Sequence, residues 1–244
     1  MTAVMTRPAG LKELEDELID LANAQHESRA YRRLFSCKLS RKGLAAHHLQ
    51  KAIWMLNRRD CWAFAQAKSP FPVKQLIWEH ESEELHGGGA REVQNHYELA
   101  IREGESIGLT RSDFAQAEPT DATLTCCKAW LQLVSSEPWL KGFSACAALE
   151  LTNSGELLAG GKGASRRMAE HIAASLGIGM EKQHSLREHI VADVEHANIM
   201  MKVANEFALG ELERRQIIEG ARESWAIDRV FREHLAVLIE SFKD

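Results

Sequence analysis

Apolar residues recur at helical spacing along almost the whole chain, and the strict alternation typical of β-strands is nearly absent. Glycines follow several of the periodic stretches, for example Gly108 and Gly177, where they favour helix ends. The pattern therefore predicts an all-α protein. The expected helices cover residues 11–27, 40–67, 72–86, 90–107, 119–135, 138–158, 163–176, 181–208 and 212–241.

The helix expected over 181–208 carries His189, Asp193 and His196 at positions i, i+4 and i+7. These side chains lie within roughly 40° of one another around a helix axis. Leu186 and Met200 continue the same stripe, so the polar groups face the expected core. Burying two imidazoles and a carboxylate is costly unless something pairs with them, and a transition metal would do so. The alternative is an exposed polar face with two ordinary histidines.

A second set of candidate ligands lies on the helix expected over 72–86. Glu79 and His86 are seven residues apart and share a helical face, with Glu83 between them. Gly87 and its neighbours predict that the helix ends near His86. A solvated acidic face is the competing interpretation for this segment, because several glutamates cluster there.

Glu150 supplies a third element, as a lone carboxylate on a helix of small and apolar residues. Such a residue lies at a helix edge or is held by a partner inside. Together the segments offer three carboxylates and three histidines, as in the di-iron and di-manganese sites of helical bundles. Hard oxygen donors with imidazole favour iron or manganese over a structural zinc. The predicted metal ligands are Glu79, His86, Glu150, His189, Asp193 and His196, and Glu83 is a candidate extra ligand or catalytic base.

Composition narrows the class of protein. The 244 residues carry a net charge of −5, with 27% charged and 45% hydrophobic residues, as in an ordinary globular chain. This balance does not indicate a nucleic-acid binder, and no apolar run is long enough to span a membrane. The five cysteines form no CxxC pair and the first residues lack a secretory signal, so we expect reduced thiols and a cytoplasmic location. We expect one domain over 1–244, with its core at roughly 20–240.

These residues resemble the haem-oxygenase-like di-iron oxidases and oxygenases, in the superfamily of thiaminase-II and the pyrroloquinoline-quinone synthase C protein. The resemblance rests on the pattern Glu79-x6-His86, Glu150 and His189-x3-Asp193-x2-His196. The stretch EELHGGGAREVQNHYELAIREGESIGL is also similar to the superfamily's acidic helix and glycine-rich turn.

The resemblance implies a compact seven-helix bundle, homodimeric and without haem. It implies two Fe(II) ions per chain, with manganese as a possible substitute, that activate dioxygen to oxidise a small organic substrate. Reactions in such enzymes include N-oxygenation of amines and carbon–carbon fragmentation of amino acids or fatty acids.

The chain departs from two relatives. The chlamydial death-domain-associated protein consumes its own tyrosines and a lysine, whereas this sequence has only Tyr31 and Tyr97 and places Gly160 ten residues after Glu150. Thiaminase-II needs a cysteine in a Pro-Cys context, and Cys146 lies in Ser-Ala-Cys-Ala. Two alternatives stay open: a metal-free oxidase or thiaminase-like enzyme on the same scaffold, and a non-enzymatic binding or regulatory protein.

Overall fold

The computed structural model describes residues 10–87 and 94–243, apart from the side chains of residues 191–195. Within these ranges the chain is helical and contains no strand, which confirms the predicted all-α class. Two short 3-10 segments, η2 (Ala159–Gly161) and η3 (Met180–Lys182), precede α9 and α10. The α-helices are α1 (Leu11–His26), α2 (Arg29–Leu34), α3 (Arg41–Lys68), α4 (Phe71–His86), α5 (His96–Glu105), α6 (Arg111–Ala115), α7 (Asp121–Ser136), α8 (Trp139–Leu151), α9 (Ala164–Leu176), α10 (His184–Phe207) and α11 (Glu211–Ser241).

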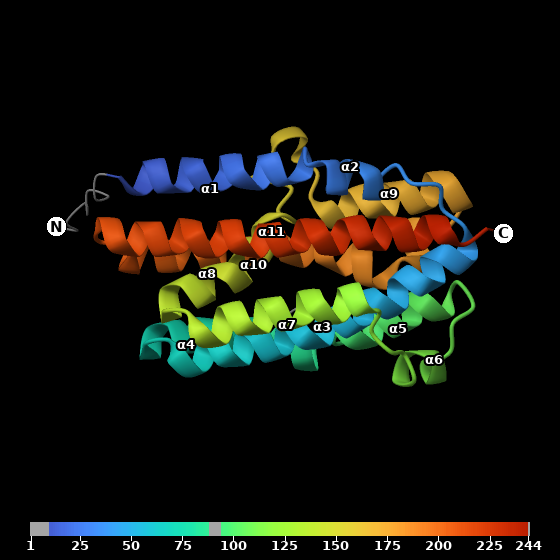
Figure 1. The fold of residues 1–244 in the computed structure, drawn as a ribbon, viewed down its shortest axis with the longest axis horizontal. Coiled ribbons are helices and arrows are strands. Elements are labelled where there is room, and N and C mark those ends of the chain that lie inside the picture. Colours follow the sequence, from blue (N-terminus) through green and yellow to red (C-terminus); the bar gives the residue numbers. More distant parts are fainter. Residues whose placement is uncertain (1–9, 88–93, 244) are drawn as a thin grey trace.

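The long helices run along the longest axis of the molecule (Figure 1). In this view α1, α2 and α11 lie above, and α3, α4, α5 and α7 lie below. The expected count of seven helices is wrong, because the described residues form eleven α-helices. Two short ones, α2 and α6, were not predicted. Each begins at a hydroxyl cap, Ser28 for α2 and Thr110 for α6, whose oxygen accepts a backbone N–H of the first turn.

Helix α8 forms the centre of the bundle and packs on α3, α7, α10 and α11. Its small residues allow the backbones to approach closely. A Cβ added to Gly220 of α11 would lie 2.2 Å from the Lys141 carbonyl oxygen of α8. Hydroxyls complete the contact, since the Ser224 Oγ donates to the Ala145 carbonyl at 2.6 Å. The central helix therefore carries Glu150, in its last turn, into the interior.

Helix α8 ends at Leu151, earlier than the expected residue 158. The Thr152 Oγ1 donates to the Leu149 carbonyl at 2.7 Å and satisfies one of the last acceptors of the helix. The chain then turns back, because a Cβ at Gly163 would lie 1.9 Å from the Asn153 carbonyl oxygen. This close approach needs glycine, and it fixes the start of α9 beside the end of α8.

The helix expected over 90–107 is confirmed from His96 to Glu105, and the helix expected over 181–208 forms α10. Residues 88–93 lie outside the described part of the chain. A buried carboxylate links α5 to α10, since Glu103 Oε2 accepts the Leu186 backbone N–H at 3.0 Å. Leu186 lies in the first turn of α10, where backbone donors have no partner within the helix. Glu103 thus fixes the start of the helix that carries His189 and His196.

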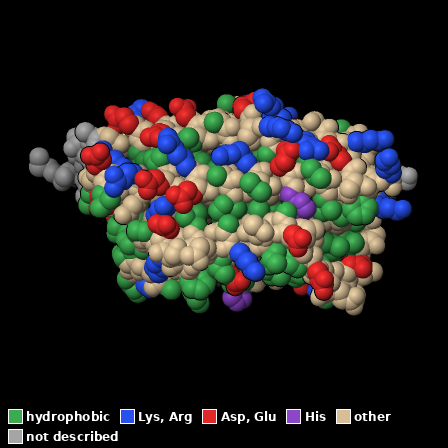
Figure 2. Space-filling model, viewed as in Figure 1, with side chains coloured by type: hydrophobic (Ala, Val, Ile, Leu, Met, Phe, Trp, Pro, Cys, Tyr) green, Lys and Arg blue, Asp and Glu red, His purple; other side chains and the backbone are tan. Residues whose placement is uncertain are grey.

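None of the described helices is both long enough and apolar enough to cross a membrane. Figure 2 shows acidic and basic side chains intermingled on the upper part of the visible face, over α1 and α11. All five cysteines are buried and free, in agreement with the expected reduced thiols.

Replacing Gly220 by valine tests the close contact between α8 and α11. The added side chain has no space beside the Lys141 carbonyl, so we expect the free energy of unfolding to fall by about 2 kcal/mol or more. Chemical denaturation measures the change. Val230→Ala on the exposed face of the same helix is the control, and it should change stability by less than about 0.5 kcal/mol. Equal stability of Gly220→Val and wild type would contradict the packing described here.

Candidate metal centre

The side chains of α4 that face the bundle are Val73, Ile77, His80 and Glu84. They follow a single stripe with the three- and four-residue spacing of a helix. At about 100° per residue, Glu79 and His86 fall on the opposite side from Ile77. Both are exposed in the structure. The prediction that Glu79 and His86 lie on the buried face of this helix was therefore wrong. The apolar residues Val73 and Ile77, which precede the acidic cluster, determine which face is buried.

Two groups of metal-binding residues converge on Glu84. The first contains His80, Glu84 and His196, and the second contains Glu84, His96 and His189. Within each group, one donor atom from every residue lies within 4.8 Å of the others. The members come from α4, α5 and α10, so three segments distant in sequence meet at one carboxylate. An arrangement of this kind can hold two cations with Glu84 shared between them.

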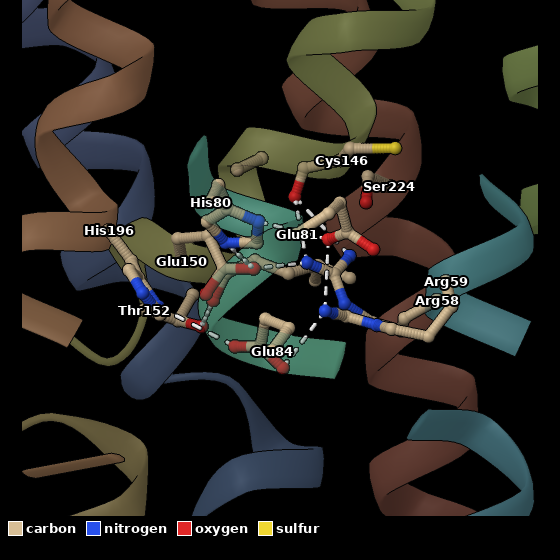
Figure 3. A network of polar contacts seen from close by, with 12 residues as sticks. Arg58, Arg59, His80, Glu81, Glu84, Cys146, Glu150, Thr152, His196 and Ser224 are labelled. Atoms are coloured by element: carbon tan, nitrogen blue, oxygen red, sulfur yellow. Dashed lines mark hydrogen bonds and ion pairs between the residues drawn. The ribbon is translucent and has the colours of Figure 1, made fainter. Parts of the chain in front are cut away.

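Glu150 reaches the first group from α8. Its Oε1 lies 3.7 Å from His80 Nε2 and forms a short ion pair with Arg58 of α3. Figure 3 shows His80, Glu84 and His196 around this carboxylate, with Arg58 and Arg59 on the side of α3. Burial opposes ionisation of Glu150, but Arg58, His80 and His196 together outweigh it and lower the pKa of the carboxyl. Glu150 is therefore an ionised carboxylate inside the bundle.

Glu84 is also ionised, although only 7% of it is exposed. Burial raises its pKa, but Arg59 and the imidazole of His96 reverse this effect and hold the pKa well below the usual range. The Arg59 Nη1 lies 2.9 Å from Glu84 Oε2, and His96 Nδ1 lies 2.9 Å from Glu84 Oε1. The shared carboxylate thus meets positive or donor groups on both oxygens, which is the environment that a cation would provide.

Outer partners orient two of the histidines. The His80 Nδ1 lies 3.0 Å from Glu81 Oε1, and the His189 Nδ1 lies 2.7 Å from the Ser185 carbonyl oxygen. In each case the Nε2 remains for the centre, as in metal sites where a carboxylate or carbonyl fixes the tautomer of a ligating histidine. The His80 Nε2 is buried and has no hydrogen-bond partner among the described residues.

The histidines around Glu84 are suited to ligation because burial keeps two of them neutral. Burial and the neighbouring His96 lower the pKa of His189 to about 3. Burial and His80 also lower the pKa of His196. A neutral imidazole offers a lone pair, whereas a protonated one does not. Neutral imidazoles with two ionised carboxylates form a donor set that fits iron or manganese.

The structure places some of the predicted residues at the centre and others away from it. Glu150, His189 and His196 are brought together, whereas Glu79 and His86 point to solvent on α4. Asp193 lies on α10 one turn after His189, and its side chain is outside the described part. Glu83 is 44% exposed at its side chain, with Oε2 3.4 Å from His196 Nε2.

Sequence reasoning missed His80, Glu84 and the inner position of His96. The stripe Val73, Ile77, His80, Glu84 contained the signal for the α4 pair, because the two apolar residues define the buried face. His96 was not among the predicted ligands. Its position depends on how the chain returns after α4, and no local pattern encodes that return.

A cavity of about 270 Å³ opens beside the centre. Glu84, His96, Glu150 and His189 line it at the metal centre. Apolar walls come from several helices, and the lining includes Leu34, Phe35, Trp54, Met55, Leu149 and Met168. A small organic molecule therefore has direct access to the converging ligands.

Residues 46–229 match the family described as "Iron-containing redox enzyme". The chain belongs to this haem-oxygenase-like family. The match includes in full all four helices that carry the centre, α4, α5, α8 and α10. It confirms the resemblance drawn from the sequence. No curated protein matches the chain.

Solved structures support the same fold. A CADD-like protein of unknown function from Nostoc punctiforme superposes with a TM-score of 0.73 at 18% identity, covering 94% of this chain and 98% of its own. A Shewanella denitrificans domain of unknown function with a heme oxygenase-like fold gives 0.71 at 14% identity, covering 92% and 91%. A TenA homologue from Pseudomonas syringae gives 0.64 at 14%, covering 93% and 92%.

Buried histidines predict that the metal-free protein loses stability in mild acid. Burial lowers the pKa of His26 to about 4 and that of His48 to about 3. Unfolded histidine titrates near pH 6.5, so below that pH the unfolded state binds protons that the folded state does not. Stability should therefore fall as the pH drops from 7 to 5, by up to about 1.4 kcal/mol per pH unit for each such histidine.

Urea unfolding of metal-free protein at several pH values measures this slope. His48→Gln should reduce it, and replacement of the exposed His86 by glutamine is the control. A stability that does not change between pH 7 and pH 5 would contradict the prediction.

Proposed function

We propose that the protein is a non-haem di-iron oxygenase or oxidase that oxidises a small organic substrate with dioxygen. The single observation that carries this proposal is the pair of three-residue groups that share Glu84. The family supports iron and redox chemistry, and the cavity beside the centre supports a small-molecule substrate.

In the proposed ligand set, His80, Glu84 and His196 would hold one iron with Glu150 beside them. Glu84, His96 and His189 would hold the other, and Asp193 stays in the proposal as a further ligand from α10. This set replaces Glu79 and His86 by His80 and Glu84 on the same helix. When bound, the irons supply the electrons and the Lewis acidity for oxygen chemistry.

The residues of the chain prepare the site in three ways. Glu81 and Ser185 orient the imidazoles of His80 and His189. Arg58 and Arg59 neutralise the negative charges of Glu150 and Glu84 when no cation is present. The apolar walls of the cavity exclude water, which strengthens electrostatic interactions at the centre.

Glu83 has a supporting role in the proposal. Its Oε2 lies 3.4 Å from His196 Nε2, and almost half of the side chain is exposed. A carboxylate at this position can accept a proton at Oε2 and exchange it with solvent. We therefore retain Glu83 as a proton-handling residue at the rim of the centre.

The nucleophile that a thiaminase-like enzyme needs is not available at Cys146. The thiol is buried, and burial raises its pKa well above the ordinary value. It is also not among the residues that line the cavity. Catalysis by a thiolate needs the opposite environment, with an accessible sulfur and a lowered pKa.

A homodimer and a cytoplasmic location remain part of the proposal. Phe71, Trp78 and Leu85 lie seven residues apart on the outer face of α4 and are 71%, 67% and 52% exposed. This apolar stripe is compatible with association of two copies.

Anaerobic titration with Fe(II) tests the proposed centre. Wild type should saturate near two equivalents, and added oxygen should change the visible absorbance. Glu84→Gln should bind less than one equivalent tightly, because it removes the carboxylate that both groups share. Glu79→Gln on the exposed face of the same helix is the matched control and should bind iron as wild type does.

Two results would contradict the proposal. The dinuclear assignment fails if wild type takes up no more than one equivalent. The proposal that both irons share Glu84 is contradicted if Glu84→Gln still binds two equivalents of Fe(II). Circular dichroism of each variant shows whether it remains folded, so that loss of binding can be separated from loss of structure.

A further inference from the structure

We infer that Glu103 is a positioning residue for the metal centre, and that its carboxylate acts on His189 through a single peptide group. The peptide that joins Ser185 to Leu186 donates its N–H to Glu103 Oε2 at 3.0 Å, and its carbonyl oxygen lies 2.7 Å from His189 Nδ1. In a trans peptide the N–H and the C=O point in opposite directions. The carboxylate and the imidazole therefore lie at the two ends of one hydrogen-bonded chain. The inference rests on the proposed function only in assigning His189 as a metal ligand.

The linking peptide lies in the first turn of α10, where backbone N–H groups have no partner within the helix. Glu103 reaches it from α5 and is 2% exposed, so water does not compete for the N–H. On the other side, the Ser185 carbonyl accepts the backbone N–H four residues later in the helix as well as the imidazole. A carbonyl with two donors holds both more strongly when its own peptide N–H is bonded to a carboxylate, because hydrogen bonds in series polarise one another.

The surroundings of Glu103 direct its charge to this peptide. The nearest nitrogen of His48 lies 3.6 Å from Glu103 Oε1, and burial lowers the pKa of His48 to about 3, so this imidazole is neutral. Burial raises the pKa of Glu103, against Lys51 and the backbone N–H groups of Leu186 and Ser185, which lower it. The amino end of a long helix also favours an anion. A carboxylate accepts an N–H more strongly than a neutral oxygen does.

The consequence for His189 is a fixed tautomer and a stronger donor atom. With its proton on Nδ1, the imidazole presents the Nε2 lone pair, and an imidazole that donates to a stronger acceptor is a more basic ligand. The other ligand group contains a direct version of this arrangement, because His80 Nδ1 lies 3.0 Å from Glu81 Oε1. Each of the two groups that share Glu84 therefore contains one imidazole linked to a carboxylate, directly for His80 and through one peptide for His189.

The structure also contains a matched bond without a carboxylate. The His26 Nε2 lies 2.7 Å from the Thr152 carbonyl oxygen, the same length as the bond of His189. The N–H of that peptide belongs to Asn153 and donates to the backbone carbonyl of Glu150 at 3.1 Å. The two imidazoles thus differ in what lies beyond the peptide, and His26 is an internal reference.

Nuclear magnetic resonance of metal-free protein labelled with nitrogen-15 in histidine tests the chain without any metal. His189 should be a single tautomer, and its Nδ1 proton should resonate downfield of the Nε2 proton of His26. Glu103→Gln keeps the shape and an accepting oxygen but removes the charge, so it should move the His189 proton upfield and leave His26 unchanged. Glu105→Gln, at an exposed position of the same helix, is the control and should leave both signals in place.

Calorimetric titration with Mn(II) tests the effect on the centre. Glu103→Gln should weaken one of the two equivalents by about three- to tenfold, because a direct outer partner is worth about 10–100-fold and Glu103 acts through one more group. The equivalent bound by His80 and His196 should keep its affinity. A role limited to fixing the start of α10 would weaken both equivalents, because α10 carries His196 as well as His189.

The inference is overturned if Glu103→Gln leaves the His189 proton in place, if it binds Mn(II) as wild type does, or if both equivalents weaken equally. Should circular dichroism show that this variant does not fold, the wild-type comparison decides, and a His189 proton upfield of that of His26 overturns the inference. A shifted proton in the metal-free variant, together with no Mn(II) uptake by wild type, would support the hydrogen-bonded chain and contradict the proposed function instead.

Discussion

A carboxylate ionised inside an apolar bundle is the constraint around which this structure is arranged. Glu84 loses most of its hydration, and an isolated buried charge of this kind would be strongly destabilising. Arg59 and His96 approach its two oxygens at 2.9 Å and compensate for that loss. The packing of α3, α4 and α5 must therefore keep Arg59 and His96 beside the Glu84 carboxylate.

The arginines of α3 neutralise the buried carboxylates of the metal-free protein. Arg58 pairs with Glu150 and Arg59 pairs with Glu84, so adjacent residues of one helix neutralise carboxylates from two others (Figure 3). A metal ion would enter a site that is already folded and would share these carboxylates with the arginines. The close contact between α8 and α11, where Gly220 meets the Lys141 backbone, holds the helix that carries Glu150 against its neighbour.

The helical class and most helix positions could be predicted from the periodicity of apolar residues, and α10 with its histidines was clear because its polar residues interrupt an apolar stripe. The buried position of Glu150 could also be predicted, because the small residues around it indicated a buried helix. The face of α4 was misassigned because a spacing of seven residues, Glu79 to His86, was preferred over the stripe begun by Val73 and Ile77. The short helices α2 and α6 depend on local caps, and the position of His96 depends on tertiary packing, so neither follows from periodicity.

The central claim is that one carboxylate, Glu84, lies between two cations. A crystal structure of the protein loaded anaerobically with Mn(II), with anomalous scattering measured near the manganese edge, tests it most directly. The account predicts two peaks, one bordered by His80 and His196 and the other by His96 and His189, with the Glu84 carboxylate in contact with both. A single peak, or two peaks of which one is out of reach of Glu84, would contradict it.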